Sequence, residues 1–215
     1  MVPDLATITN AQSCEAGLDI GIVIDKSLSV KKGNLQNAIR LLRDVVSKSN
    51  PSPEADHFGL ITFNSIATLE FDFKDPNFHN KTALLARIDA EPGELKKWTR
   101  IDLALEKAKN MFSIEGGDRP GMPNLMVVLT DGKFTNKTEE EFTAIVNMVS
   151  GDFQQKNVSI VVVGLGESIR SDVLVKIAGS TGEVKPLSEL ESVIARKKEE
   201  LGVCPGIMMH TFHSE

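Results

Sequence analysis

The chain has 215 residues, of which 41% are hydrophobic and 25% are charged, and its formal net charge is −6 at pH 7. This size and balance indicate one globular domain with a single core. The negative charge argues against a general nucleic-acid binder and against a protein held on anionic membranes, because both need net positive fields. No apolar run approaches the ~20 residues that cross a bilayer, so we expect no direct membrane insertion.

The two ends of the chain carry no helical or strand pattern. We expect 1–13 to be a flexible tail, 14–204 to be the folded domain, and 205–215 to be a second tail. The opening stretch "MVPDLATITN" lacks the charged-then-apolar profile of a secretion signal.

Short apolar runs alternate with helical patterns along the chain. The first run, "LDIGIVID", predicts a strand over 18–25, and the apolar spacing from Leu35 to Val46 predicts a helix after it. Strand patterns at 57–64 and 66–73 are almost adjacent and predict an antiparallel hairpin, whose second strand alternates apolar and polar residues as an edge strand does. The remaining expected elements are helices 80–89 and 101–113, strand 124–131, helix 138–150, strand 158–164, helix 169–178, strand 183–187 and helix 188–200.

This alternation of wholly apolar strands and helices predicts the fold class. We expect a doubly wound α/β fold with a six-stranded, mostly parallel sheet, one antiparallel edge strand, and helices on both faces. In such sheets ligands bind beyond the carboxyl ends of the strands, where neighbouring crossovers leave in opposite directions.

Five oxygen-bearing side chains fall at that end of the predicted sheet. Asp25 and Asp131 end two strands, Ser27 and Ser29 follow the first of them, and Thr99 lies just before a helix. If the first and fourth strands are neighbours, the three segments converge. Two carboxylates and three hydroxyls are hard donors that suit Mg²⁺, Mn²⁺ or Ca²⁺ and suit zinc or copper poorly. Neutral hydroxyls leave a divalent ion partly compensated, so it can still attract an external carboxylate.

At these residues the sequence resembles the von Willebrand factor type A domain family, which includes matrilins, integrin inserted domains and anthrax toxin receptors. The family's metal-ion-dependent adhesion motif (MIDAS) reads Asp-x-Ser-x-Ser, a distant Thr, and an Asp in a "TDG" turn. The corresponding segments are "DKSLS" at 25–29, Thr99 in "WTRIDLAL", and Asp131 in "LTDG". The resemblance covers roughly 14–204, and all five positions are filled.

The resemblance implies a bound divalent cation, with Mg²⁺ expected first and Ca²⁺ or Mn²⁺ as alternatives. It further implies that the two serines and the threonine ligate directly, that the aspartates often act through water, and that an acidic residue of a partner completes the shell. Two positions depart from the motif. Leu28 stands where the family usually has glycine, and Ile101 and Asp102 replace the usual "TG", so Asp102 either supports the site or simply begins the helix.

Cationic and aromatic side chains fall in the segments around this predicted site. They form either an ordinary solvated face or a rim that draws acidic partners such as carboxylate-rich or sulfated matrix polymers. The tryptophan is either a packing residue or a contact anchor for a partner. The predicted rim consists of Lys26, Lys96, Lys97, Trp98, Arg100 and Lys133.

Cysteines and sequons favour an extracellular protein. Cys14 and Cys204 flank the predicted domain, and we expect a disulfide that joins its ends, the alternative being two unrelated buried thiols. The candidate N-glycosylation sites are Asn80, Asn136 and Asn157.

The main hypothesis is a non-enzymatic, secreted adhesion or matrix-binding module whose partner is a matrix or cell-surface protein with an acidic residue, or a collagen-like, acidic or sulfated polymer. One alternative is a structural matrix protein that self-associates without using the metal. A less favoured one is an Mg²⁺-dependent aspartyl-phosphate phosphatase, whose usual second acid would stand at Ser27. A Ser/His/Asp triad is not expected, because His57 enters a strand at the opposite end.

Overall fold

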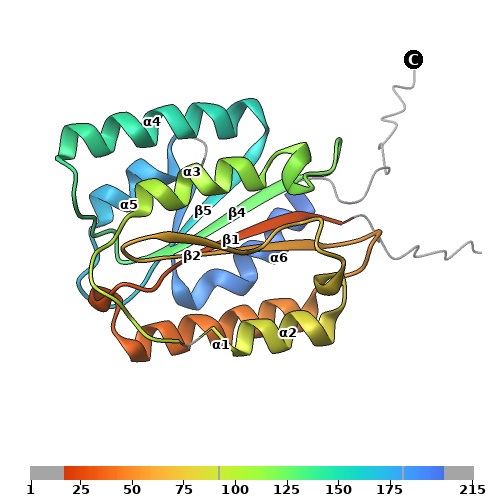
Figure 1. Ribbon diagram of the computed structural model, residues 1–215. Coiled ribbons are helices and arrows are strands. Elements are labelled where there is room, and N and C mark those ends of the chain that lie inside the picture. The colour runs from red at the N-terminus through yellow and green to blue at the C-terminus, as the bar shows by residue number, and fades with distance from the viewer. Residues whose placement is uncertain (1–16, 92, 181, 201–215) are drawn as a thin grey trace, which may run out of the picture.

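The described part of the chain forms one sheet of six strands in the order β3-β2-β1-β4-β5-β6. The computed structural model describes residues 17–91, 93–180 and 182–200, and in these ranges the sheet lies between two layers of helices (Figure 1). Cys14 and Cys204 lie outside the described residues. The predicted fold class, an α/β sheet that is mostly parallel with one antiparallel edge pair, is confirmed.

The four central strands are apolar, β-branched runs, and helices cover both of their faces. The prediction that the first and fourth strands are neighbours is confirmed, because β1 pairs in parallel with both β2 and β4. All seven residues of β1, β2 and β4 are buried, as expected for a parallel sheet covered on both sides. The central strands are β1 (Asp19–Asp25), β2 (His57–Phe63), β4 (Asn124–Thr130) and β5 (Val158–Gly164).

The two edge strands are shorter. β3 (Ala67–Phe71) pairs antiparallel with β2, as predicted for the hairpin, and β6 (Glu183–Pro186) pairs in parallel with β5. The expected alternation along β3 is wrong at Leu69, which is 38% exposed. The reason is a shift in register between Leu60 and Ile61, because an irregularity of this kind reverses which face a side chain takes.

Helices cover the sheet in two layers, each with its own part of the core. One buried cluster joins α1, α2 and α6 to one face of the sheet, and the other joins α3, α4 and α5 to the opposite face. No helix within the described ranges combines the length and apolar character needed to cross a membrane. The helices are α1 (Lys32–Lys48), α2 (Lys81–Asp89), α3 (Ile101–Met111), α4 (Glu139–Gln155), α5 (Ser171–Ala178) and α6 (Leu190–Glu200), with 3₁₀ turns at Leu28–Val30, Pro76–Phe78, Ile114–Gly116 and Leu187–Glu189.

A topological switch point lies between β1 and β4. After β1 the chain enters α1 on one face of the sheet, whereas after β4 it enters α4 on the other face. The loops that follow these two neighbouring strands therefore diverge at the carboxyl end of the sheet, on the left in Figure 1. This is where a doubly wound fold leaves a crevice for a ligand.

Candidate metal centre

Strand β1 ends on a buried carboxylate, Asp25, whose hydrogen-bond donors within the described residues are all neutral. Asp25 Oδ1 accepts from the backbone N–H of Ser27 at 2.8 Å, and Oδ2 accepts from the Thr130 hydroxyl at 2.7 Å. Burial raises the pKa of Asp25 to about 6, although the bonds from Ser27 and Thr130 oppose this rise. A negative charge at Asp25 therefore lacks full compensation.

The next residues of this loop bring two hydroxyls together. The Oγ atoms of Ser27 and Ser29 lie 2.9 Å apart, and Ser27 is buried. Leu28 between them is 52% exposed, so this chain does turn alternate residues in opposite directions. A leucine in place of the family's usual glycine adds an apolar side chain to the surface beside the two hydroxyls.

The threonine loop is hydrogen-bonded directly to the serine loop. Lys96 N–H donates to the Lys26 carbonyl at 3.1 Å, and Leu28 N–H donates to the Lys96 carbonyl at 2.9 Å. Three residues further on, Thr99 is buried. Trp98, just before it, has a φ of 72°, a strained value for an aromatic residue that persists only where neighbouring contacts fix the backbone.

The loop after β4 completes the arrangement. Asp131 is buried and accepts from the backbone N–H of Lys133 at 3.0 Å. Further along, Thr135 N–H donates to the Thr99 carbonyl at 3.0 Å, and its hydroxyl accepts from Thr99 N–H at 2.9 Å. This loop requires glycine at position 132, directly after Asp131, because the φ of Gly132 is 79° and a Cβ there would lie 2.5 Å from Leu174 Cδ1.

Backbone contacts thus bring all three predicted segments to one end of the sheet. The predicted ligands on these segments carry hard oxygens and no sulfur or imidazole, and this donor set fits Mg²⁺, Mn²⁺ or Ca²⁺. In the described ranges, no three His, Cys, Asp or Glu side chains are placed to hold a metal ion, so the candidate site depends on its hydroxyls. The residues gathered are Asp25, Ser27, Ser29, Thr99 and Asp131.

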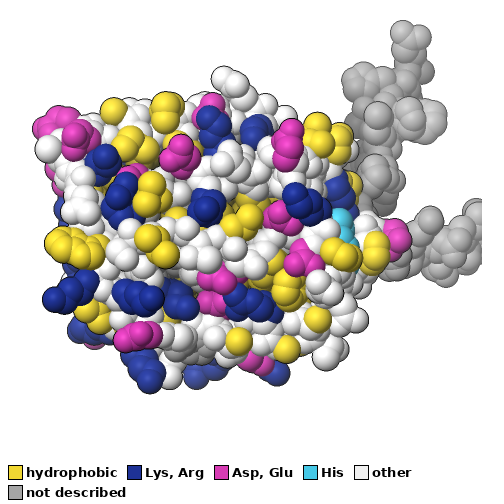
Figure 2. Space-filling view, viewed as in Figure 1, with side chains coloured by type: hydrophobic (Ala, Val, Ile, Leu, Met, Phe, Trp, Pro, Cys, Tyr) yellow, Lys and Arg dark blue, Asp and Glu magenta, His cyan; other side chains and the backbone are white. Residues whose placement is uncertain are grey.

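The predicted cationic rim is only partly available to a partner. Lys96, Lys97 and Trp98 are exposed. Lys133 Nζ lies 3.0 Å from Asp131 Oδ2, and its side chain is 41% exposed, so it already neutralises one carboxylate of the site. Figure 2, in the same view as Figure 1, shows Lys and Arg side chains at the carboxyl end of the sheet, on the left, and over the rest of the visible face as well.

Two expected rim residues are occupied inside the molecule. The side chain of Lys26 is 14% exposed and pairs with Glu91 at 3.2 Å, so the prediction that Lys26 belongs to an exposed rim is wrong. The guanidinium of Arg100 binds both carboxylate oxygens of Asp102, the shortest bond being 2.7 Å. Asp102 lies in the first turn of α3, and its carboxylate binds the guanidinium of Arg100.

An ion-pair network behind the serine loop was not foreseen from sequence. Arg87 binds Glu91 and also Glu70, at 2.5 Å, and Glu70 accepts from the Thr62 hydroxyl at 2.7 Å. Through Glu91 this network reaches Lys26, within the serine loop itself. No local pattern signals it, because its members come from the loop after β1, from β2 and β3, and from α2 and the segment that follows it.

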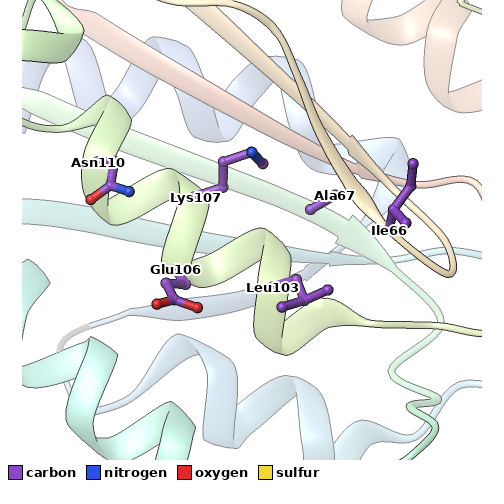
Figure 3. Close-up of a pocket in the computed structure, with 6 residues that line it drawn as sticks. All are labelled: Ile66, Ala67, Leu103, Glu106, Lys107 and Asn110. Atoms are coloured by element: carbon purple, nitrogen blue, oxygen red, sulfur yellow. The ribbon is translucent and has the colours of Figure 1, made fainter.

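A groove of about 280 Å³ runs beside the same end of the molecule. Figure 3 shows its walls, which are one side of α3 and the start of β3. It contains one lysine and one glutamate and no buried charged residue. Its lining residues are Ile66, Ala67, Leu103, Glu106, Lys107 and Asn110.

Comparison of this sequence with known proteins identifies the family to which the chain belongs. A family model described as von Willebrand factor type A domain matches residues 19–195. Matrilin-1 of Gallus gallus is 29% identical over 126 residues, which cover 56% of this chain and 25% of that protein. Vitrin of Homo sapiens is 28% identical over 124 residues, covering 57% and 18% respectively. The chain therefore spans about a quarter or less of the length of these curated relatives.

Solved structures share the fold. A manganese-loaded TRAP protein of Plasmodium vivax has a TM-score of 0.71 at 19% identity, over 84% of this chain and 73% of that one. Proximal thread matrix protein 1 from the mussel byssus, with zinc in its MIDAS motif, has a TM-score of 0.66 at 24% identity, over 85% and 45%. At these identities the likeness is evidence for the fold alone.

Proposed function

Since this chain belongs to the von Willebrand factor type A domain family, we propose that it is an extracellular adhesion or matrix-binding module that acts through a divalent cation. The single observation that carries the proposal is the hydrogen bonding of the threonine loop to both aspartate-ended loops. Lys96 is bonded to the serine loop, and Thr99 is bonded to Thr135 in the loop after β4. Segments that are distant in sequence thereby meet at the switch point, where ligands of such sheets bind.

In this proposal the chain's own oxygens hold the ion. The hydroxyls of Ser27, Ser29 and Thr99 ligate it, and Asp25 and Asp131 contribute directly or through water. When bound, the cation supplies an open coordination position that accepts a carboxylate of a partner. Mg²⁺ is the expected ion, with Ca²⁺ and Mn²⁺ as alternatives. The zinc in the MIDAS motif of the mussel protein supports a metal at this position of the fold, and the manganese-loaded TRAP protein supports the binding of a divalent metal by this fold.

The proposed partner is a matrix or cell-surface macromolecule that presents acidic groups. Relatives that include a collagen alpha-6(VI) chain, 25% identical over 62% of this chain, support a matrix setting. The exposed Lys96 and Lys97 support an acidic partner, because cations at the edge of an interface speed the approach of a negatively charged molecule. Trp98, 55% exposed beside Thr99, is the proposed contact anchor.

A metal titration tests this proposal. We expect Mg²⁺ and Mn²⁺ to raise the melting temperature of the wild type and to bind with one ion per chain in calorimetry. Ser27→Ala should lose that response, whereas Ser171→Ala, a matched change at an exposed serine of α5, should keep it. Absence of a metal response in the folded wild type would contradict the proposal.

Partner binding separates the remaining alternatives. Binding to matrix components that EDTA abolishes supports the adhesion function. Self-association that ignores EDTA would favour a structural matrix protein instead, and turnover of a phosphate ester with Mg²⁺ would favour a phosphatase. We expect no turnover, because Ser27 occupies the position where that chemistry needs a second acid.

A further inference from the structure

Three sequon asparagines are exposed, and one of them lies at a different end of the molecule from the others. Asn80 begins α2 beside His79, which stacks on His57 at the start of β2, and Asn157 directly precedes β5. Both therefore lie at the amino end of the sheet. Asn136 instead lies in the loop between β4 and α4, at the carboxyl end (Figure 1).

Asn136 is one residue from the contact that closes the candidate metal centre. Its neighbour Thr135 exchanges two hydrogen bonds with Thr99, at 2.9 and 3.0 Å. Because consecutive Cα atoms are about 3.8 Å apart, Asn136 is held beside the threonine loop. The exposed Trp98 precedes Thr99 in that loop.

The backbone around Asn136 is fixed on both sides. Asn136 has a φ of 64°, a left-handed conformation that asparagine tolerates better than most residues. Two residues later Thr138 caps α4, and its side chain and backbone exchange hydrogen bonds with Glu141 in a capping box. A group attached to Asn136 would therefore stay close to the threonine loop of the metal centre, because the segment that carries it is anchored to Thr99 and to α4.

We propose that Asn136 carries an N-linked glycan that shields the metal centre from macromolecular partners while the ion itself still enters. This inference rests on the proposed adhesion function and on passage through the secretory pathway. A glycan is bulky and hydrophilic, whereas a specific interface needs roughly 800 Å² of clear surface on each partner. A metal ion needs only a water-sized path.

The attachment is a transfer of oligosaccharide from a lipid-linked pyrophosphate donor. The Nδ2 atom of Asn136 forms a bond to the anomeric carbon of the first sugar, and the bond from that carbon to the pyrophosphate oxygen breaks. The amide loses one proton, and the lipid pyrophosphate leaves. No electrons are gained or lost by the chain.

The test compares the full chain secreted from a eukaryotic host with the same chain made in bacteria. Thr138→Asn removes the sequon yet keeps a residue that can cap α4, and Asn136→Gly is a second variant that tolerates the left-handed backbone. Thr82→Ala and Ser159→Ala are matched controls that remove the two sequons at the amino end. Intact mass gives glycan occupancy, calorimetry gives Mn²⁺ affinity, and immobilised poly-L-glutamate with Mg²⁺ is the macromolecular probe.

We expect the secreted wild type to carry a glycan at Asn136 and to bind poly-L-glutamate about tenfold or more weakly than Thr138→Asn, because the glycan removes contact area. Mn²⁺ affinity should be equal in both, and the two control variants should bind as the wild type does. An unmodified Asn136, or equal probe binding by glycosylated wild type and Thr138→Asn, overturns the inference. If the bacterial chain shows no Mg²⁺-dependent binding, the proposed function fails instead.

Discussion

Buried carboxylates at the two ends of the sheet differ in their partners. At the amino end, Asp19 is bound by the guanidinium of Arg119 at 2.6 Å, and Asp56 pairs with Lys198. At the carboxyl end, Asp25 accepts hydrogen bonds from the Ser27 amide and the Thr130 hydroxyl and pairs with no cation of the described ranges, and burial raises its pKa to about 6. The chain pairs these two buried acids at the amino end with its own cations. At the carboxyl end it also pairs Asp131 with Lys133, but Asp25 has no ion pair among the described residues and keeps a charge that an external cation can compensate.

This comparison also shows which end is structural. Asp56 accepts from the backbone N–H of Leu18 at 3.1 Å and pairs with Lys198, so it ties the start of the domain to α6. The loop before α3 at the carboxyl end contains backbone strain at an aromatic residue, Trp98, and strain of this kind clusters at binding sites. The predictions below test this division, in order of expected effect.

The proposed bond between Cys14 and Cys204 should have the largest effect on stability. The contact between Lys198 and Asp56, together with that between Asp56 and Leu18, brings the described flanks of the domain to one end. Closing so long a loop stabilises a chain by up to about 5 kcal/mol in the chain-entropy description. Reduction or Cys204→Ser should lower the melting temperature, and an unchanged value would contradict the bond.

Arg119→Ala should lower the free energy of unfolding by removing an ion pair at the amino end of the sheet. The substitution leaves Asp19 buried without its cation, which costs on the order of 3 kcal/mol of unfolding free energy. Urea denaturation of the variant measures this loss, and Arg40→Ala, at a surface arginine bonded only to Asn37 in the described structure, is the control. A loss no greater than that of the control would show that Arg119 does not neutralise Asp19.

Asp25 should give the metal-free protein an unusual pH dependence. Its folded pKa of about 6 lies above the unfolded value of 3.8, so the folded state binds the extra proton between these values. Its contribution to stability is therefore present below pH 4 and is lost as the pH rises through 6, a change of roughly 2 to 3 kcal/mol.

Asp25→Asn isolates this contribution. In EDTA, the difference in unfolding free energy between the variant and the wild type should grow in favour of the variant as the pH rises from 4 to 7. A difference that stays constant over this range would show that Asp25 is not the titrating group. With Mg²⁺ present the wild type should regain stability and the variant should not.

The exposed lysines should have the smallest effect. Lys96→Gln with Lys97→Gln should slow association with immobilised poly-L-glutamate about twofold to fivefold, and added salt should remove the difference. Lys48→Gln with Lys81→Gln changes the net charge equally at the amino end and is the control. Equal association rates for the two double variants would exclude a cationic rim.

Most of the fold followed from local patterns. Buried strands such as β1 and β4 are nearly continuous apolar runs, and their neighbours are amphipathic helices, so type and order could be read from periodicity. Boundaries were less accurate. Helix α4 continues to Gln155, beyond its predicted end at 150, because Phe153 adds another buried position. The register shift beside Leu69 was not foreseen, because it depends on pairing with β2.

The candidate site was predictable only in part, for the same physical reason. The five oxygen-bearing residues proposed for it followed from short motifs after two strands and before one helix. The pairing of Lys26 with Glu91 and the bonds of Thr135 to Thr99 join residues 65 and 36 positions apart, and no local spacing encodes such contacts. The first contact pairs Lys26 within the molecule, and the second fixes the position of the threonine loop.

A Mn²⁺ titration at pH 6, by calorimetry in buffers of different ionisation enthalpy, tests the central claim most directly. If the charge of Asp25 is compensated by a bound cation, one ion should bind per chain. Binding should also release a fraction of a proton, because a carboxyl with a pKa of about 6 is about half protonated at this pH. Asp25→Asn should bind more weakly and release none. A wild type that takes up no Mn²⁺, or takes it up without releasing protons, would contradict the account.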